Sequence, residues 1–412
     1  MGTFPKGFLW GAATSSYQVE GNNNNCDWWE WEKKTNHEQS GAACRHYELY
    51  EQDFDLAKEL GHNAHRFSIG WSRVEPQEGV FSESEIEHYR RVIRALKERG
   101  LEPVVTLHHF TNPLWLVKLG GWEKNKVQDY FLRYVKKIVD ALSQDVRFWI
   151  TINEPLIYVS HCYIMGVWPP QEKSTWKAKQ VENNLLKSHI KAYNLIHGIY
   201  RNKNIPSVFV SFAKNMQAFV PYNNSWLNKL AVYLRNKFFN FEFVEQAINK
   251  SSLDFIGINY YSRSLVNAKN PGFHDLFLRT ANDENIKKNS LGWDIYPQGL
   301  YDLLVKLKKF KLPVMISENG ICTSDDNLRW EYIREHLKSL AQAMSEGVEV
   351  WGYLYWSLLD NFEWDKGFGP RFGLIEVDYQ NYKRNVRGSA RKLAEVCRTG
   401  VVIEPPINNG TN

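Results

Sequence analysis

Two kinds of hydrophobic pattern alternate along the chain. Short apolar runs rich in β-branched and aromatic residues are typical of buried strands, and segments whose apolar residues recur every three or four positions are typical of amphipathic helices. The first pattern predicts strands at 8–13, 63–69, 103–109, 146–154, 208–213, 254–261, 314–318 and 350–356. The second predicts helices at 47–60, 84–99, 127–142, 181–200, 226–248, 300–310, 328–344 and 390–397. A long polar insertion follows the first strand and runs through Cys44.

The alternation of strands and helices predicts an α/β fold with a parallel sheet. Eight such pairs are the number that closes into a (β/α)8 TIM barrel. A doubly wound open sheet is the alternative, but the segment 7–11, Gly-Phe-Leu-Trp-Gly, does not supply its usual phosphate-binding loop. We therefore expect one TIM barrel over residues 1–403, with long loops at the C-terminal face of the strands, and a flexible tail at 404–412.

Two of the expected strands end in a glutamate that is followed by a turn or a breaker. The fourth strand leads into Glu154 and Pro155, and the seventh leads into Glu318, Asn319 and Gly320. A carboxylate at the end of a buried strand is held by rigid backbone and can still face a cleft. Each glutamate alone could equally be a helix cap or a surface acid. Two matching strand ends favour a pair of facing carboxylates.

Other polar and aromatic residues also lie at strand ends. The C-terminal ends of barrel strands meet at one face, and active sites of TIM barrels lie on that face. The residues expected there are Gln18, Arg66, His108, His109, Asn153, Asn259, Tyr261 and Trp356. Each of them has an ordinary structural explanation, such as a core ion pair for Arg66. Their common position favours a shared site.

Charge and cysteine usage narrow the classes of partner. The net charge is +5 from 51 basic and 46 acidic side chains, which are interspersed, so nucleic acid and membrane partners are not indicated. The chain shows no secretory signal pattern and no apolar stretch of about 18 residues. Its five cysteines are far apart and lack zinc-ligand spacing, which fits a reducing compartment. We expect a cytoplasmic protein.

Aromatic residues are abundant, with 16 Trp, 21 Tyr and 22 Phe. Several tryptophans, such as Trp28, Trp29 and Trp31, stand in polar, loop-like surroundings. The flat C–H faces of sugar rings stack on aromatic planes, so this excess mildly favours a carbohydrate ligand.

Five segments together carry a family resemblance. They are WGAATSSYQVEG (10–21), TINEP (151–155), INYY (258–261), SENG (317–320) and WSLLDNFEW (356–364). In this order they resemble glycoside hydrolase family 1, the β-glucosidases and β-galactosidases, over residues 4–402. The resemblance implies a TIM barrel that hydrolyses terminal non-reducing β-D-glucosyl residues, with β-D-galactosyl or β-D-fucosyl residues as further substrates. The substrates would be small β-glycosides or oligosaccharides, and the anomeric configuration would be retained.

The resemblance also implies roles for individual residues. Glu318 is similar to the nucleophile, and Glu154 is similar to the acid/base. Sugar-binding positions are matched by Gln18, His109, Asn153, Trp356, Glu363 and Trp364. Supporting positions around the carboxylates are matched by Arg66, Asn259 and Tyr261. The chemistry needs no metal ion and no organic cofactor.

Some features leave alternatives open. Phe110 stands where the family commonly has Trp, and the segment between Trp226 and Asp254 is shorter than in most members. These departures concern the aglycone side, where Trp293 is either an aromatic wall or a core anchor of its loop. The alternative functions are a 6-phospho-β-glycosidase, a transglycosylase and a non-catalytic sugar-binding protein. Oligomeric state is left open.

Overall fold

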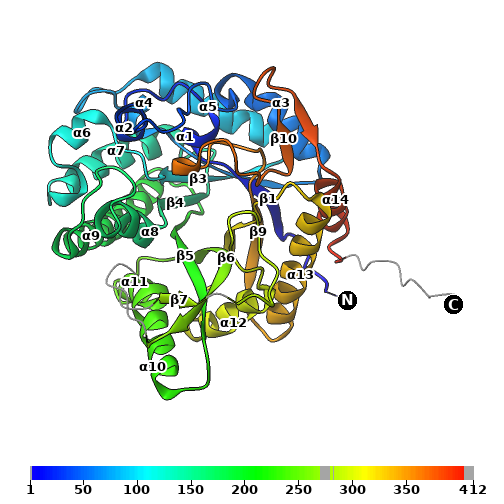
Figure 1. The fold of residues 1–412 in the computed structure, drawn as a ribbon. Coiled ribbons are helices and arrows are strands. Elements are labelled where there is room, and N and C mark those ends of the chain that lie inside the picture. Colours follow the sequence, from blue (N-terminus) through cyan, green and yellow to red (C-terminus); the bar gives the residue numbers. More distant parts are fainter. Residues whose placement is uncertain (1, 270–278, 282, 403–412) are drawn as a thin grey trace.

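A closed barrel of parallel strands organises the protein. The computed structural model describes residues 2–269, 279–281 and 283–402. Within these residues eight strands pair in the order β5-β4-β3-β2-β1-β9-β8-β6, and a further parallel pairing between β5 and β6 closes the ring (Figure 1). The barrel strands are β1 (Leu9–Ala13), β2 (Ala64–Ser68), β3 (Glu102–His108), β4 (Phe148–Asn153), β5 (Phe209–Pro221), β6 (Ile256–Asn267), β8 (Val314–Asn319) and β9 (Val350–Trp356). The predicted (β/α)8 TIM barrel is confirmed.

Helices follow the strands and surround the barrel (Figure 1). The longer helices are α2 (Asp27–Thr35), α3 (His46–Glu59), α5 (Glu83–Glu98), α7 (Val127–Leu142), α9 (Thr175–Asn202), α10 (Trp226–Arg235), α11 (Glu242–Ile248), α12 (Pro297–Leu307), α13 (Asp326–Ser345) and α14 (Gly388–Thr399). Single-turn helices occur in the loops as α1 (Ser16–Val19), α4 (Trp71–Val74), α6 (Leu114–Lys118) and α8 (Pro155–Val159). The short strand β7 (Arg279–Ala281) extends the sheet beside β6, and β10 (Ile375–Val377) pairs with β11 (Arg384–Val386).

Successive residues of a strand point to opposite faces of the sheet, so apolar side chains of the strands pack both inside the barrel and between the barrel and the helices. Side chains that point into the barrel make a small cluster, to which β3 contributes Val104 and β8 contributes Met315. Side chains that point outward, such as the neighbouring Val105 and Ile316, join the larger core between strands and helices. The barrel is therefore filled with side chains, and a cavity can form only above this filling, at the strand ends.

The observed order of elements agrees with the predicted one, and the main difference concerns β5 and β6. The predicted strands ended at residues 213 and 261, whereas the observed strands continue to Pro221 and Asn267. Beyond the barrel the two extensions pair with each other in parallel, from Ala218 opposite Arg263 to Pro221 opposite Val266. Polar residues such as Lys214 and Gln217 interrupt the apolar pattern here, so the pattern does not predict the longer strands.

Two predicted segments have more structure than expected. The predicted helix 226–248 is α10 followed by a π-helical turn (Asn236–Phe241) and α11. The polar insertion before Cys44 contains α1 and α2, and both Trp28 and Trp31 in α2 are buried. These two tryptophans pack in the core, so the suggestion that they contact a carbohydrate was wrong for them.

The remaining expectations concern the end of the chain and membranes. The expected tail at 404–412 lies outside the described residues. In the part of the chain that the structure describes, no helix is both long enough and apolar enough to cross a bilayer.

Candidate active site

A pocket of about 690 Å³ lies at the C-terminal ends of the barrel strands. It is the space above the apolar filling of the barrel. The structure brings most of the predicted site residues to its wall, namely Gln18, His109, Asn153, Glu154, Tyr261, Trp293, Glu318, Trp356, Glu363 and Trp364. Arg66 and Asn259 lie directly behind this wall, fully buried, where they contact the two strand-end glutamates.

Glu154 is fixed by the backbone at the end of β4. Pro155 opens α8, and the helical conformation is unfavourable for the residue before a proline, so the strand turns sharply here. Glu154 has φ +42°, in the left-handed region that non-glycine residues rarely adopt, and its N–H donates to the Ala213 carbonyl at 2.7 Å. Its Oε1 accepts hydrogen bonds from the amides of Asn259 at 2.8 Å and Asn215 at 3.2 Å. All the hydrogen-bond donors to the Glu154 carboxyl group are therefore uncharged amides.

Glu318 lies near the end of β8 and has a cationic donor. The Arg66 guanidinium forms an ion pair with its Oε1, and the Tyr261 hydroxyl donates to its Oε2 at 2.5 Å. Arg66 also donates to Asn153 Oδ1 at 2.7 Å, which ties the two strand ends together. A Cβ at Gly320 would collide with the backbone oxygen of Trp356, so the turn after Glu318 can pack this closely only with glycine.

The two glutamates differ in proton affinity because their neighbours differ. Burial, together with the negative charge of Glu318, raises the pKa of Glu154 to about 7, and the amide donors only partly oppose this rise. Burial also raises the pKa of Glu318, but Arg66 and the Tyr261 hydroxyl both act to lower it. Two close carboxyl groups share a first proton, and the group whose hydrogen-bond donors are all neutral takes it. The arrangement favours a protonated Glu154 beside an ionised Glu318.

A third carboxyl group, that of Glu363, enters the pocket from the loop after β9. The Gln18 amide donates to Glu363 Oε2 at 3.3 Å and to the Phe362 carbonyl at 2.9 Å, so one side chain fixes both the loop and its acid. Burial and the charges of Glu318 and Asp365 raise the pKa of Glu363 to about 8. A carboxyl group with this pKa can donate as well as accept a hydrogen bond near neutral pH.

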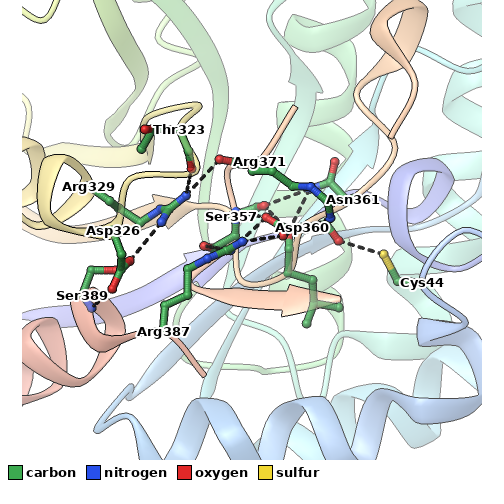
Figure 2. Close-up of polar contacts among 12 residues, drawn as sticks. Cys44, Thr323, Asp326, Arg329, Ser357, Asp360, Asn361, Arg371, Arg387 and Ser389 are labelled. Atoms are coloured by element: carbon green, nitrogen blue, oxygen red, sulfur yellow. Dashed lines mark hydrogen bonds and ion pairs between the residues drawn. The ribbon is translucent and has the colours of Figure 1, made fainter. Parts of the chain in front are cut away.

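A buried ionic network holds the loop 357–364 from behind, and Figure 2 shows its side chains. Asp360 is fully buried and accepts hydrogen bonds from Arg387 at 2.8 and 3.0 Å and from Arg371 at 3.3 Å. The Cys44 thiol donates to the Asp360 carbonyl at 3.0 Å. Arg387 caps the N-terminus of α14, Arg371 lies in the loop before β10, and Cys44 lies in the segment before α3, so the network connects distant parts of the chain to the loop that carries Glu363.

Aromatic rings form much of the remaining wall. The His109 ring lies nearly parallel to the indoles of Trp356 and Trp364, with centroids at 6.1 and 6.0 Å. Phe110 is buried at the pocket wall, with its ring 5.2 Å from that of Trp364. Trp28 packs behind Trp364 at 4.7 Å. The buried tryptophans of α2 therefore support the pocket wall without lining it.

One predicted strand-end residue does not reach the site, and several residues of the site were not predicted. His108 is buried outside the pocket, where its ring packs against Trp122 and Tyr158 and bonds to Asn112 Oδ1 at 3.1 Å. Asn215 and Trp168 line the pocket without having been singled out. Only the unforeseen extension of β5 gives Asn215 its place beside Glu154.

Trp293 lies at the pocket wall with its side chain 39% exposed. Its ring approaches those of Tyr261 at 5.9 Å and Phe372 at 6.2 Å. The exposure and the contacts agree with the aromatic-wall alternative better than with an anchor buried in the core.

Two carboxyl groups with opposed hydrogen-bond surroundings, facing a pocket with aromatic walls, define the class of protein: this is a glycoside hydrolase. The chain belongs to glycosyl hydrolase family 1, whose sequence model matches residues 1–249 and 231–401. The resemblance seen in its motifs is thereby confirmed.

Named relatives agree with this assignment. β-Glucosidase A of Thermotoga maritima is 31% identical over 96% of this chain and 98% of its own length. A 6-phospho-β-galactosidase of Clostridium acetobutylicum is 31% identical over 95% of this chain and 96% of its own. Among solved structures, a β-glycosidase from Pyrococcus horikoshii is 40% identical and superposes with a TM-score of 0.92, covering 98% of this chain and 96% of its own.

Proposed function

We propose that the protein is a retaining exo-β-glycosidase that removes terminal, unmodified β-D-glucosyl residues, with β-D-galactosyl or β-D-fucosyl residues as further substrates. The observation that carries the proposal is the pair of buried carboxyl groups, in which Glu318 contacts a guanidinium and Glu154 contacts only amides. This asymmetry supplies an ionised nucleophile and a protonated acid at the same pH.

In the first step Glu318 attacks the anomeric carbon while Glu154 protonates the departing oxygen. The bond from the anomeric carbon to the aglycone oxygen breaks, and an ester bond to Glu318 forms through an oxocarbenium-like transition state. Arg66 and Tyr261 hold the attacking carboxylate in place. The amide of Asn153, fixed by Arg66 and by His109 at 3.1 Å, would contact the sugar 2-hydroxyl.

In the second step Glu154 acts as a base. After the first step it has lost its proton, and the ester at Glu318 no longer carries a charge, so Glu154 can take a proton from water. The water oxygen attacks the anomeric carbon and releases Glu318. Two inversions at the same carbon give net retention of the β configuration.

The packing behind the pocket supports removal of single terminal sugars. Trp364 is backed by Trp28 at 4.7 Å and by Tyr17, whose ring is stacked on it at 5.9 Å. Because this end of the pocket is backed by the core, a sugar chain has no path beyond Gln18 and Glu363. The substrate would therefore place its non-reducing end there.

A 6-phospho-β-glycosidase is the second candidate, because one relative with 31% identity is a 6-phospho-β-galactosidase. The lack of an unpaired cation beside Glu363 argues against it. Glu363 is an acid at the place expected for the 6-hydroxyl, and the nearby Lys366 already pairs with Asp365 at 2.6 Å. A phosphate carries nearly two negative charges near neutral pH and would have no unpaired cation among these residues.

Turnover of nitrophenyl β-glucoside tests the proposal and separates an enzyme from a sugar-binding protein. We expect release of nitrophenol by the wild type, its loss in Glu318→Ala, and formation of β-glucose as the first product in a time-resolved NMR experiment. Formation of α-glucose first would contradict the retaining mechanism. Binding of glucose-like ligands without any turnover would show that the protein only binds sugars.

A further inference from the structure

The surface of α10 and the turn after it is unusually apolar. Six large side chains on this segment, which we call the α10 patch, are exposed: Trp226, Leu227, Leu230, Tyr233, Leu234 and Phe238. The exposed fractions of the aromatic members are 70% for Trp226, 61% for Tyr233 and 53% for Phe238. Their spacing of three and four residues places them on one side of the helix. Contiguous exposed apolar surface of this kind marks a site of interaction.

The opposite side of α10 faces the protein and combines polar side chains with the small apolar Ala231, which packs against Phe219 and Val266. Asn228 is buried, and its side chain binds Asn223 Oδ1 and the Ala268 N–H, each at 2.8 Å. Asn240, in the turn after α10, is also buried and bonds to both backbone groups of Gln217 at 3.1 and 2.9 Å. A surface helix normally buries its apolar side and exposes its polar side. This segment buries Asn228 and Asn240 and leaves the six side chains of the α10 patch exposed, so the patch itself is not used in folding.

Positive charge accompanies the patch. Lys229 and Lys237 are exposed on the same segment and form no ion pair within the described residues. Residues 183–241 contain eight Lys or Arg and no Asp or Glu, although the whole chain has 46 acidic side chains. The interspersed charges of the chain as a whole gave no reason to expect a membrane partner, and this local imbalance is the exception.

We propose that the α10 patch docks the protein on an anionic lipid surface. Tryptophan and tyrosine favour the boundary between headgroups and acyl chains, and helices with aromatic and leucine side chains beside lysines bind in the plane of that boundary. Lys229 and Lys237 would then lie at the level of the lipid phosphates. The helix projects from the barrel at the end of the β5 and β6 extensions, so a flat surface can reach it (Figure 1).

A second copy of the chain fits the same patch less well. A two-fold contact would bring the same residues of both copies together, including Lys229 and Lys237. The segment offers no acidic partner for them, and juxtaposed like charges disfavour association.

The projection that carries the patch begins at the pocket wall. Gln217, which holds Asn240, lines the pocket, and the Ser264 hydroxyl donates to its Oε1 at 2.7 Å. Docking through the α10 patch would therefore bring the pocket wall close to the lipid surface. The lipid contact itself does not depend on which glycoside the enzyme cleaves.

Co-sedimentation with vesicles tests the proposal. The full-length protein is mixed with vesicles of phosphatidylcholine containing phosphatidylglycerol, and with vesicles of phosphatidylcholine alone. We expect binding to the anionic vesicles that weakens with added salt. The double variant Trp226→Gln/Phe238→Gln should lose more than about tenfold in affinity, since two large apolar side chains leave the lipid. Lys229→Gln/Lys237→Gln should lose about tenfold.

A control variant at an exposed tryptophan outside the patch tests whether vesicle binding is specific to the α10 patch. Trp176 is 72% exposed and lies outside the patch, so Trp176→Gln should bind vesicles as the wild type does. Melting temperature and turnover of nitrophenyl β-glucoside should stay unchanged in all these variants. Absence of vesicle binding by the wild type, or an equal loss in Trp176→Gln, would overturn the proposal. A dimer in light scattering that the patch variants dissociate, without vesicle binding, would show a second copy as the occupant.

Discussion

Glu154 and Glu318 have the same side chain but different hydrogen-bond donors, and the proposed mechanism depends on this difference. We expect Glu318→Ala to abolish hydrolysis of every glycoside. Glu154→Ala should slow the first step strongly for a disaccharide and little for a dinitrophenyl glucoside, since a good leaving group needs no proton. Single-turnover release of the leaving group measures this step. Equal loss on both substrates would show that Glu154 is not the acid.

The pH dependence should reveal the proton on Glu154. Its pKa, raised to about 7 by burial and by Glu318, predicts that kcat/KM falls as the pH rises through that value, because the acid then loses its proton. At low pH the rate should fall again as Glu318 becomes protonated. Measuring kcat/KM across the pH range from acid to alkaline checks both falls in rate.

Substitution of Lys214 should shift the pH at which kcat/KM falls on the alkaline side. It is fully buried in β5, where burial lowers its pKa to about 7 and its side-chain nitrogen donates to the Asn215 carbonyl at 2.5 Å. When protonated, it acts to lower the pKa of Glu154. Lys214→Met should therefore raise the pKa of Glu154 and shift this fall in rate to higher pH. Lys191 is exposed, so Lys191→Met serves as the control and should leave the pH dependence of kcat/KM unchanged. A shift to lower pH in Lys214→Met would contradict this account.

Glu363 decides between a neutral sugar and its 6-phosphate. Its carboxyl group, whose pKa of about 8 lets it donate as well as accept near neutral pH, is suited to the 4- and 6-hydroxyls, whereas a phosphate at this place would find Lys366 already paired with Asp365. We expect kcat/KM for nitrophenyl β-glucoside to exceed that for its 6-phosphate by a large factor. Glu363→Ala should lower kcat/KM on the neutral substrate about 100-fold. A higher kcat/KM on the phosphorylated glycoside would overturn the assignment.

At the scale of elements, the loop before α12 brings Trp293 to the pocket. Its ring contacts Tyr261 and is partly exposed, so it can face the aglycone of a disaccharide. Trp293→Ala should raise KM for a disaccharide by about three- to tenfold, with little change in the melting temperature. Trp176→Ala serves as the control. A loss of stability with an unchanged KM would show that Trp293 is a loop anchor.

The ionic network around Asp360 connects α14 to the loop after β9 (Figure 2). Asp360→Asn removes a buried charge and leaves Arg387 and Arg371 without their carboxylate. We expect the free energy of unfolding to fall by about 3 kcal/mol, measured with urea, and KM to rise because Glu363 shifts with the loop. Glu376→Gln, at an exposed position in β10, should change neither quantity. Unchanged stability in Asp360→Asn would mean that the network does not hold the loop.

At the scale of the whole molecule, barrel closure makes the site. Glu154 and Glu318 belong to strands that are not neighbours in the barrel, since β5 and β6 lie between β4 and β8. Asn259 spans this gap, because its amide donates to Glu154 and its Oδ1 accepts from the Ser317 hydroxyl at 2.7 Å. The distance between the two carboxyl groups is thus set by the curvature of the whole ring.

The sequence by itself determined the order of the elements and the strand ends that carry polar groups. Hydrophobic period and turn residues are local properties, and they were sufficient to predict eight strands, the helices between them and the two glutamates before Pro155 and Asn319. The family motifs added Glu363 and Trp364, which lie in a loop where no periodic pattern could have indicated them.

Tertiary structure alone decided which side each residue faces and which neighbours it meets. His108 and His109 are adjacent in the chain, but only His109 reaches the pocket, because the twist and closure of the barrel determine which face points inward. Asn215 and Lys214 gained their positions from pairing between distant strands, and the α10 patch stayed exposed because the other side of that segment, through Ala231 and Asn240, contacts the β5 extension. Contacts between segments far apart in sequence produced these features, and a local pattern contains no information about such contacts.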